Sequence, residues 1–349
     1  MKNLVAMELT VIRMLAAEAR AAGRDPASDP IPALTRDVLF ASTADEEAGG
    51  LNGIAPIVAD RPELLRAAGA INEAGAVATT YGGQRFYPIG VAERGYAVYR
   101  LSVRGTWGHG SMPRDDNAAV LASQIVTRLA VQGAPRLTPA MAQFLETVGT
   151  SLDDEPRRLV KALTDPDPRP AELALDAACD PMSGRVLRAL LRDTVSPDII
   201  HAGVKYNVIP GEATIEIDCR LLPGTSEEAM RQIVLDRIGP ELAAVCDVDL
   251  VIHAPPVDAP ASGQLYDTMV RTLLDHDPAG IPAPIMVPFA SDAKHMAVLQ
   301  VPTYGFSPLQ LEPNEHFLER FHGVDERVGV NALRWGLPVL YDVVRRFCG

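Results

Sequence analysis

The segment 213–222 constrains the fold more than any other, because apolar and polar residues alternate along it. Successive side chains of a strand point to opposite faces, so such alternation is typical of a strand with one covered face and one face in water. The segments 96–103 and 248–252 are further strand candidates, and a helical stretch is expected near 226–237. We therefore predict an antiparallel sheet in an α+β domain of roughly residues 95–258. The apolar members of 213–222 include Ile215, Ile217, Cys219 and Leu221, and the polar members are Thr214, Glu216, Asp218 and Arg220.

The chain before residue 95 has a different pattern. An amphipathic helix is predicted near residues 4–15, and the apolar run 37–41 is typical of a buried strand. A helical stretch at 51–59 and a second short strand at 69–72 follow. A strand, a helix and a strand at this spacing predict a βαβ unit, in which the two strands lie parallel in one sheet.

At 349 residues the chain is too long for one ordinary core, so two domains are expected. The helix-like segment 264–275 and the strand-like segment 302–305 return to the first domain. We predict that residues 1–94 and 259–349 form one α/β domain into which residues 95–258 are inserted. A region near 135–197, rich in proline, aspartate and arginine, is predicted to be an insertion within the second domain.

The composition restricts the expected partners and compartment. The formal net charge of −13 argues against nucleic acid and anionic membrane surfaces as partners. No uninterrupted apolar run of about 18 residues occurs, so no membrane span is expected. The four cysteines are scattered and form no CxxC pair, which indicates free thiols in a reducing compartment. The sequence therefore predicts a cytoplasmic protein.

Acidic residues follow the two strand candidates of the first domain. Asp45-Glu46-Glu47 comes after the first and Glu73 directly after the second. Open α/β sheets place their active sites at the carboxyl ends of parallel strands, so these carboxylates could share a metal. One of the two adjacent glutamates could be a metal ligand and the other the base that takes a proton from a metal-bound water. A solvated acidic turn is the alternative for Asp45-Glu46-Glu47.

Two of the seven histidines have a context that suggests chemistry. His109 lies between two glycines, which would let the backbone come close to a ligand, although a flexible turn with an incidental histidine is equally compatible. His322 precedes a predicted helix start with acids in its first turn, and a structural or surface role is its alternative. The other five have no supporting spacing and are expected to be structural or solvated: His201, His253, His276, His295 and His316.

Taken together and in order, these segments resemble the M20 family of dinuclear zinc amidohydrolases, which includes carboxypeptidases, aminoacylases and deacylases of N-acyl amino acids. The resemblance runs along nearly the whole chain, and the branch it fits best is that of carboxypeptidase S-like enzymes and N-acyl amino acid hydrolases. The motifs that carry it are Asp45-Glu46-Glu47 with Gly49-Gly50, Asn72-Glu73, Arg104-Gly105, Gly108 to Pro113, Asn117-Ala118, Asn207 to Pro210, Asp218-Cys219-Arg220, Ser291 to Lys294, Gly305 to Pro308 and His322 to Arg327.

The resemblance implies a fold and a set of roles. The fold is a zinc-peptidase-like catalytic domain with a mostly parallel mixed sheet, plus an inserted α+β lid or dimerisation domain with an antiparallel sheet. Glu46 would be the general base, Glu47 and His322 would bind one zinc ion, and Glu73 would bind a second. His109, often supplied by the partner subunit, would stabilise the oxyanion of the tetrahedral intermediate.

The resemblance also implies substrate contacts. Asn207 would assist His109, and Arg220 would pair with the substrate carboxylate as a bidentate donor. An ion pair between Arg220 and Glu216 or Asp218 on its own strand is the competing interpretation. Lys294 stands where many relatives have arginine and would keep the charge without the planar fork, and Gly305 would line the substrate cleft.

One departure from the family pattern affects the metal site. The family normally begins with a His-x-Asp motif and an aspartate that bridges both zinc ions, and neither occurs in this chain. Met1-Lys2-Asn3 matches the residues that directly follow the bridging aspartate. We therefore expect an N-terminally truncated catalytic domain, either because Met1 is a start within a longer active enzyme, which we favour, or because the chain is a genuine truncated product. Three expected ligands remain, and neither remnant suffices for a catalytic zinc ion.

The sequence thus predicts a metal-dependent hydrolase that cleaves an amide bond next to a free carboxylate, in a peptide or an N-acyl amino acid. A homodimer through the second domain is expected. The alternative is a truncated, non-catalytic relative that acts as a dimerising or ligand-binding scaffold. A serine hydrolase that uses Ser111 beside His109 is disfavoured, because no Gly-x-Ser-x-Gly turn follows a strand.

Overall fold

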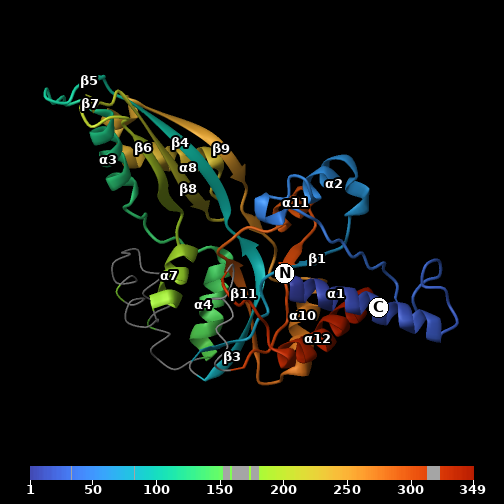
Figure 1. The fold of residues 1–349 in the computed structure, drawn as a ribbon. Helices are drawn as coiled ribbons and strands as arrows, with labels where there is room; N and C mark the ends of the chain where they lie inside the picture. The colour runs from blue at the N-terminus through green and yellow to red at the C-terminus, as the bar shows by residue number, and fades with distance from the viewer. Residues whose placement is uncertain (33, 82, 152–157, 159–172, 174–180, 313–322) are drawn as a thin grey trace.

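The structure is a computed structural model of residues 1–349 (Figure 1). It describes all of them except residues 33, 82, 152–157, 159–172, 174–180 and 313–322. His316 and the predicted metal ligand His322 lie outside the described residues. Two sheets divide the described chain into a part built on a six-stranded sheet, here called the large domain, and a part built on a four-stranded sheet, here called the small domain.

The sheet of the large domain is mixed. The long strand β3 (Gln84–Glu93) lies at its centre and pairs in parallel with β11 (Ile281–Val287). It pairs in antiparallel fashion with the strands β2 (Thr79–Tyr81), β10 (Val257–Asp258) and β12 (Thr303–Gly305). β12 pairs in parallel with the edge strand β1 (Ala70–Asn72). The predicted α/β fold with a mixed sheet is confirmed, with two parallel and three antiparallel pairings among the described strands.

Helices cover both faces of this sheet. The helices α1 (Lys2–Ala21), α10 (Gln264–His276) and α12 (Val330–Cys348) group on one side of β3 and β11, and α4 (Pro139–Ser151) lies on the other (Figure 1). The predicted N-terminal helix forms because its apolar residues recur on one face. That face packs into the core through Leu4, Met7, Val11 and Leu15.

One predicted strand of this domain is wrong. Residues 37–41 form no strand in the structure, and Leu39 is 59% exposed. The helix α2 (Ile54–Asp60) and the strand β1 form where the pattern predicts them, but the sheet ends at β1. An apolar run favours an extended backbone, yet a strand also needs a hydrogen-bonded neighbour, and 37–41 pairs with none of the described strands. The predicted βαβ unit therefore lacks its first strand.

The small domain has the predicted antiparallel sheet. Its strands lie in the order β6 (Thr194–Ala202), β8 (Glu212–Leu221), β4 (Gly95–Arg104) and β9 (Cys246–Ala254). The helices α3 (Ala118–Leu129) and α8 (Glu227–Ile238) cover one face, which buries the alternating apolar residues of β8. The side chain of Asn117 accepts a hydrogen bond from the backbone N–H of Ala119, and Ser226 does the same for Ala229. These caps satisfy donors that the first turn of each helix leaves free.

Two described helices of the predicted insertion pack on the large domain. Met141 and Phe144 of α4, and Leu190 of α7 (Pro181–Leu190), belong to the same core cluster as the strands β3 and β11. Both α4 and α7 therefore contribute to the large domain, and the chain is back in the small domain at β6. The limits of the two domains stay a prediction.

Two of the connections between the domains lie side by side. β3 leads into β4 through Arg94, and β9 leads back into β10 through residues 255–256. A Cβ atom on Gly95 would lie 2.5 Å from the backbone nitrogen of Pro256, so only glycine fits where the two connections meet. Separately, no helix among the described residues is long and apolar enough to cross a membrane. The predicted compartment stays a prediction.

Candidate active site

Glu46 and Glu47 lie on a short 3-10 turn, Glu46–Ala48, which local hydrogen bonds close. Asp45 takes the left-handed conformation at φ 68°, and its Oδ2 accepts hydrogen bonds from both the backbone nitrogen and Nδ2 of Asn52, each at 2.9 Å. Left-handed backbone is tolerated by aspartate better than by most residues other than glycine. The turn thus fixes the two glutamates in a defined place.

The segment that begins the helix α11 (Ala293–Val298) holds this turn from behind. Nε2 of His295 donates to the carbonyl oxygen of Gly49 at 2.9 Å, and Oδ2 of Asp292 accepts from Oγ1 of Thr43 at 2.8 Å. A Cβ atom on Gly50 would lie 2.7 Å from Oδ1 of Asp292, so the backbone of the turn rests directly against this carboxylate. Asp292 and His295 therefore position the turn that carries Glu46.

Glu73 comes from a different element but reaches the same place. It directly follows β1, and its segment approaches β12 closely, since a Cβ atom on Gly305 would lie 2.4 Å from the carbonyl oxygen of Ala74. Burial raises the pKa of Glu73. The N-terminal amino group lowers it, and the charges of Glu93 and Glu47 raise it further.

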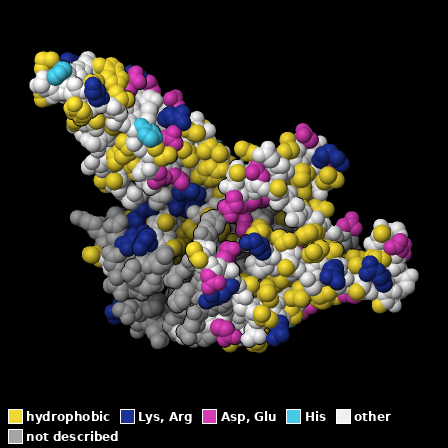
Figure 2. All heavy atoms as spheres, viewed as in Figure 1, with side chains coloured by type: hydrophobic (Ala, Val, Ile, Leu, Met, Phe, Trp, Pro, Cys, Tyr) yellow, Lys and Arg dark blue, Asp and Glu magenta, His cyan; other side chains and the backbone are white. Residues whose placement is uncertain are grey.

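Glu46 shows the strongest electrostatic perturbation of the group. Burial and the neighbouring charge of Glu73 raise the pKa of Glu46 to about 7, while Lys294 lowers it, and Asp292 and Glu47 add to the rise. Like charges disfavour the ionised form of a carboxyl group, and so does burial. The structure thus brings the three sequence-predicted glutamates together with Lys294. Acidic side chains gather where the small domain meets the part of the large domain that holds α2 and α11 (Figure 2).

Behind this cluster lies a buried polar network centred on Ser291. Its Oγ donates to Oε1 of Glu93 at 2.5 Å and accepts from Nδ2 of Asn72 at 2.8 Å. Nζ of Lys294, which is 6% exposed, donates to the carbonyl oxygen of Ser291 at 2.9 Å. The network ties the end of β1, the end of β3 and the start of α11 into one unit. Lys294 is therefore fixed by the protein itself.

His109 and Asn207 lie together but apart from the glutamates. They sit on the two-stranded ribbon formed by β5 (Gly108–His109) and β7 (Val208–Ile209), where the backbone nitrogen of Gly110 donates to the carbonyl oxygen of Asn207. This ribbon forms the far tip of the small domain, away from β1 and α11 (Figure 1). His109 is exposed, and its Nδ1 lies 2.8 Å from Oγ of Ser111.

Arg220 forms an ion pair on its own strand. Its Nε and Nη2 donate to the two carboxylate oxygens of Asp218, both at 2.8 Å. The sequence leaves two partners open for Arg220, a substrate carboxylate or an acid on its own strand. The structure shows the ion pair with Asp218 on β8. The guanidinium also lies over the ring of Tyr96, 5.6 Å from its centroid. Gly305 is buried within the sheet beside Asn72, its register partner on β1.

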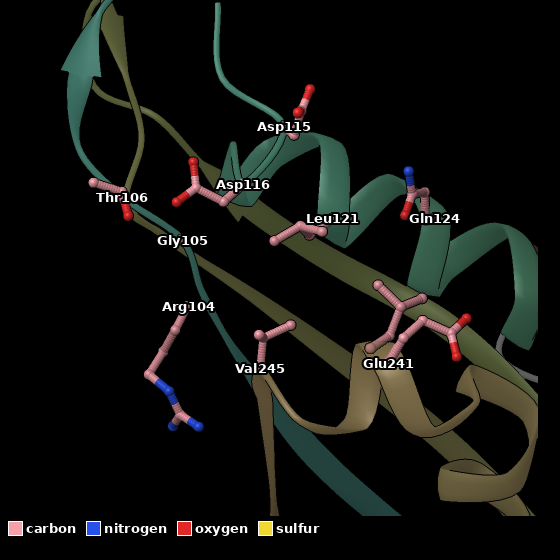
Figure 3. Close-up of a pocket in the computed structure, with 10 residues that line it drawn as sticks. Arg104, Gly105, Thr106, Asp115, Asp116, Leu121, Gln124, Glu241 and Val245 are labelled. Carbon is pink, nitrogen blue, oxygen red and sulfur yellow. The ribbon is translucent and has the colours of Figure 1, made fainter.

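A cavity of about 500 Å³ in the small domain contains none of the predicted site residues (Figure 3). It opens between α3 and the short helix α9 (Pro240–Ala243). Three charged groups on its wall are already paired: Asp116 with Arg114, Glu241 with Arg128, and Arg104 with Asp247. The cavity therefore offers few free charges for a ligand.

The described residues do not form a metal site by themselves. No group of three or more histidine, cysteine, aspartate or glutamate side chains within the described part of the chain is arranged to hold a metal ion. A catalytic zinc ion generally requires three protein ligands. Glu47 and Glu73 are carboxylates of the right kind, but the described donor set is too small for a catalytic zinc ion.

Some residues of this site have no role assigned from the sequence. Asp292 and Ser291 belong to a recognised motif without an assigned function, Glu93 is not singled out, and His295 is expected to be structural. His295 does make a structural contact, but to the turn of the proposed base. These residues could be found from the sequence as polar residues at the ends of strands, because Glu46, Glu47 and Glu73 are selected by the same criterion.

Comparison with known proteins finds similarity to one family. The model of the peptidase dimerisation domain of the M20 family matches residues 91–246, which include the whole small-domain sheet up to the start of β9. The chain is 28% identical over 264 residues to the probable carboxypeptidase S-like 2 of Dictyostelium discoideum. It is 25% identical over 332 residues to the N-fatty-acyl-amino acid synthase/hydrolase PM20D1 of Bos taurus.

The chain is similar to members of the M20 family. Both relatives fit the carboxypeptidase S-like and N-acyl amino acid hydrolase branch. The matches cover 74% and 89% of this chain, but 48% and 61% of the two relatives. The chain thus spans between about half and three fifths of the length of these relatives.

Solved structures show the same fold. The M20 family metallo-carboxypeptidase Sso-CP2 from Sulfolobus solfataricus superimposes with a TM-score of 0.58 at 15% identity, over 87% of this chain and 68% of that one. The aminopeptidase PepT from Bacillus cereus gives a TM-score of 0.55 at 12% identity, over 88% and 63%. At this identity the likeness concerns the fold alone.

Proposed function

We propose that this M20 protein carries the proton-transfer part of an amide hydrolase. Its substrate would hold the scissile amide next to a free carboxylate, as in a peptide C-terminus or an N-acyl amino acid. The proposal rests on the position of Glu46, which lies on a hydrogen-bonded turn among other carboxylates, where burial and the charge of Glu73 raise its pKa to about 7. A general base works best when its pKa lies near the operating pH, because it is then both available and able to accept a proton.

Glu46 would accept the proton of the water that attacks the amide carbonyl and would pass it to the leaving amine. Burial and the surrounding carboxylates supply the shift that suits this role. Asp292 and His295 would hold the turn so that the carboxylate keeps its direction. Positioning of this kind reduces the entropy cost of reaching the transition state.

The cofactor of this proposal is a pair of zinc ions. Glu47 and His322 are the proposed ligands of one and Glu73 of the other, as the family resemblance implies, and a bound zinc ion would supply a Lewis acid. The similarity in fold to a protein named a metallo-carboxypeptidase supports a metal in general terms. The described residues alone do not complete either site.

The distance of His109 and Asn207 from the glutamates in the fold supports a homodimer. A histidine at the far tip of the small domain cannot serve the glutamates of its own chain in this arrangement, so it would serve those of a second copy. Four large apolar side chains near the tip are exposed, as expected of a contact surface: Trp107, Met112, Val204 and Tyr206. The match to a dimerisation domain is consistent with this assembly.

The test is turnover of N-acyl amino acids and dipeptides by the wild-type chain and by Glu46→Gln, with zinc added. Loss of a positioned base lowers the rate by roughly 10²–10⁴-fold. Glu63→Gln is the matched control, because Glu63 is an exposed glutamate on the 3-10 turn Pro62–Leu64. Full activity of Glu46→Gln would remove Glu46 from the mechanism, and an inert wild-type chain would contradict the activity.

The second candidate function is a non-catalytic scaffold that dimerises or binds a ligand. The absence of a three-ligand metal group among the described residues favours it. It predicts a folded dimer with negligible zinc, measured by sedimentation and by elemental analysis of the purified protein. Two tightly held zinc ions per chain would contradict it.

A further inference from the structure

We propose that Tyr96 contacts the substrate and donates a hydrogen bond to its carboxylate beside Arg220. This inference rests on the proposed function, because it names a residue that selects the substrate of the same site. It arises from the position of Tyr96 between two groups that come from different domains.

Tyr96 is the second residue of β4, directly after the connection between the domains, and it is the register partner of Arg220 on β8. Both residues lie on the face of the small-domain sheet that α3 and α8 leave uncovered, since the alternate residues of β4 and β8 are buried under these helices. The guanidinium of Arg220 lies over the Tyr96 ring.

The hydroxyl of Tyr96 extends to the turn that carries the proposed base. A Cβ atom on Gly49 would lie 3.4 Å from this hydroxyl oxygen, which places it against the backbone three residues after Glu46. The charges of Arg220 and Glu46 both act on the Tyr96 hydroxyl. A substrate whose carboxylate reaches Tyr96 and Arg220 would therefore have its amide near Glu46.

Arg220 alone is a weakened receptor for a carboxylate. Asp218 already occupies Nε and Nη2, which are the donors that Arg220 would otherwise present as a fork. The negative charge of Asp218 also offsets the positive charge that a substrate carboxylate would meet. A second donor close to Arg220 is therefore needed for firm binding.

The Tyr96 hydroxyl is such a donor. It forms no hydrogen bond with any residue that the structure describes, although the side chain is half-buried. Burial raises the pKa of Tyr96, so its hydroxyl keeps its proton at neutral pH. A half-buried hydroxyl without a protein partner, next to a cationic side chain, suits an anionic oxygen of a ligand.

The experiment compares the wild-type chain, Tyr96→Phe and Tyr341→Phe on an N-acyl amino acid and on its carboxamide analogue. Tyr341 lies on α12 in the large domain and provides the same chemical change away from Arg220 and the turn that carries Glu46. Loss of a hydrogen bond to a charged group corresponds to roughly a 10-fold or greater change in affinity. We expect KM of Tyr96→Phe to rise by that factor for the carboxylate substrate, with kcat little changed and the carboxamide unaffected.

Equal KM values in the wild type and Tyr96→Phe would overturn the proposal. An equal loss on the carboxamide would overturn it as well, because a residue that merely props the two domains apart would affect both substrates. If the wild-type chain turns over neither compound, the proposed activity fails separately. The binding of the N-acyl amino acid, followed by calorimetry, then decides on Tyr96: roughly 10-fold weaker binding by Tyr96→Phe supports its role. Equal binding, or no binding to the wild type, overturns it.

Discussion

Glu93 and Arg94 are adjacent in the chain, yet their side chains bind to different domains. Glu93 accepts hydrogen bonds from the backbone nitrogen and the hydroxyl of Ser291, in the large domain. Nη2 of Arg94 donates to Oγ1 of Thr194 at 2.7 Å and to the carbonyl oxygens of Arg192 and Arg220, near the base of the small domain. The connection between β3 and β4 is therefore anchored in both domains.

Arg94→Ala should destabilise the small domain by about 2–3 kcal/mol, because it leaves buried carbonyl oxygens without a charged donor. Arg94 is 3% exposed, so water cannot readily replace its hydrogen bonds. Denaturant unfolding measures the change. Arg100→Ala is the control, since it breaks an exposed ion pair with Glu216 and should cost less than about 1 kcal/mol. Equal costs for the two variants would contradict the anchoring role.

Gly305→Ala should move the segment that carries Glu73. The added Cβ atom would lie 2.4 Å from the carbonyl oxygen of Ala74 and 2.9 Å from that of Glu73, and backbone cannot yield as a side chain can. Overpacking of this kind typically costs about 1–3 kcal/mol. We expect a lower melting temperature and a loss of any hydrolytic turnover.

Gly133→Ala is the control for Gly305→Ala, because it makes the same substitution where the added Cβ atom meets a side chain and not the backbone. Its Cβ atom would meet the far end of the Arg237 side chain at 3.0 Å, which can move aside. A melting temperature of Gly305→Ala equal to that of Gly133→Ala would show that the contact between β12 and the Glu73 segment is looser than described.

Asp277→Asn should reduce stability at neutral pH by about 1–3 kcal/mol. Asp277 accepts hydrogen bonds from Nη1 of Arg85 at 2.6 Å and from the hydroxyl of Tyr87 at 2.8 Å. Burial alone would raise the pKa of Asp277, but the hydrogen bonds from Arg85 and Tyr87 outweigh it and lower the pKa.

The sign of the pH dependence follows from this lowered pKa. The unfolded chain takes up a proton at a higher pH than the folded chain, so the stabilisation by Asp277 is present above its ordinary pKa of 3.8 and is lost as the pH falls through the lowered value. The difference between the wild type and Asp277→Asn should therefore shrink in acid. A difference that stays constant from pH 7 to pH 2 in thermal melts would contradict it.

Glu8→Gln should have the opposite pH dependence. Burial raises the pKa of Glu8 on α1 to about 7, from an ordinary value of 4.5. The folded chain then holds a proton that the unfolded chain releases, so stability falls as the pH rises from 4.5 to 7. Glutamine carries no charge, so we expect Glu8→Gln to be more stable than the wild type by about 1 kcal/mol at pH 8, a value reduced for partial exposure of the side chain.

At pH 4 the Glu8→Gln variant and the wild type should have equal melting temperatures. Glu18→Gln on the same helix is the comparison, because Glu18 forms an ion pair with Arg345 and its loss should not stabilise the chain. A wild type that is at least as stable as Glu8→Gln at pH 8 would contradict a destabilising burial of the Glu8 carboxylate.

The sequence predicts most elements of this fold because their patterns are local. The alternation along β8 follows directly from one covered face, and the spacing of Leu4, Met7 and Val11 follows from a helix on a core. The strand predicted at residues 37–41 is wrong because strand formation there is not a local property. Whether an apolar run becomes a strand depends on a neighbour that the run itself does not encode.

The residues of the candidate site also fall into those that a local pattern predicts and those that it does not. Glu46, Glu47 and Glu73 can be selected because they follow predicted strands, and the structure brings them together. The ion pair between Arg220 and Asp218 stands among the alternatives because the two residues share a face of one strand. The role of Tyr96 could not be foreseen, since it depends on how closely two domains approach at Gly49. No local pattern reports that distance.

The stacking of Tyr87 on Trp335 has a practical consequence. The two rings lie 5.3 Å apart at 11°, on the core of the large domain, whereas Trp107 is 52% exposed near the tip of the small domain. Trp107 and Trp335 are the two tryptophans of the chain. Each domain thus carries one tryptophan, which is partly buried in the large domain and exposed in the small domain. Emission from Trp107→Phe and Trp335→Phe variants would let the melting of either domain be observed separately in an unlabelled protein.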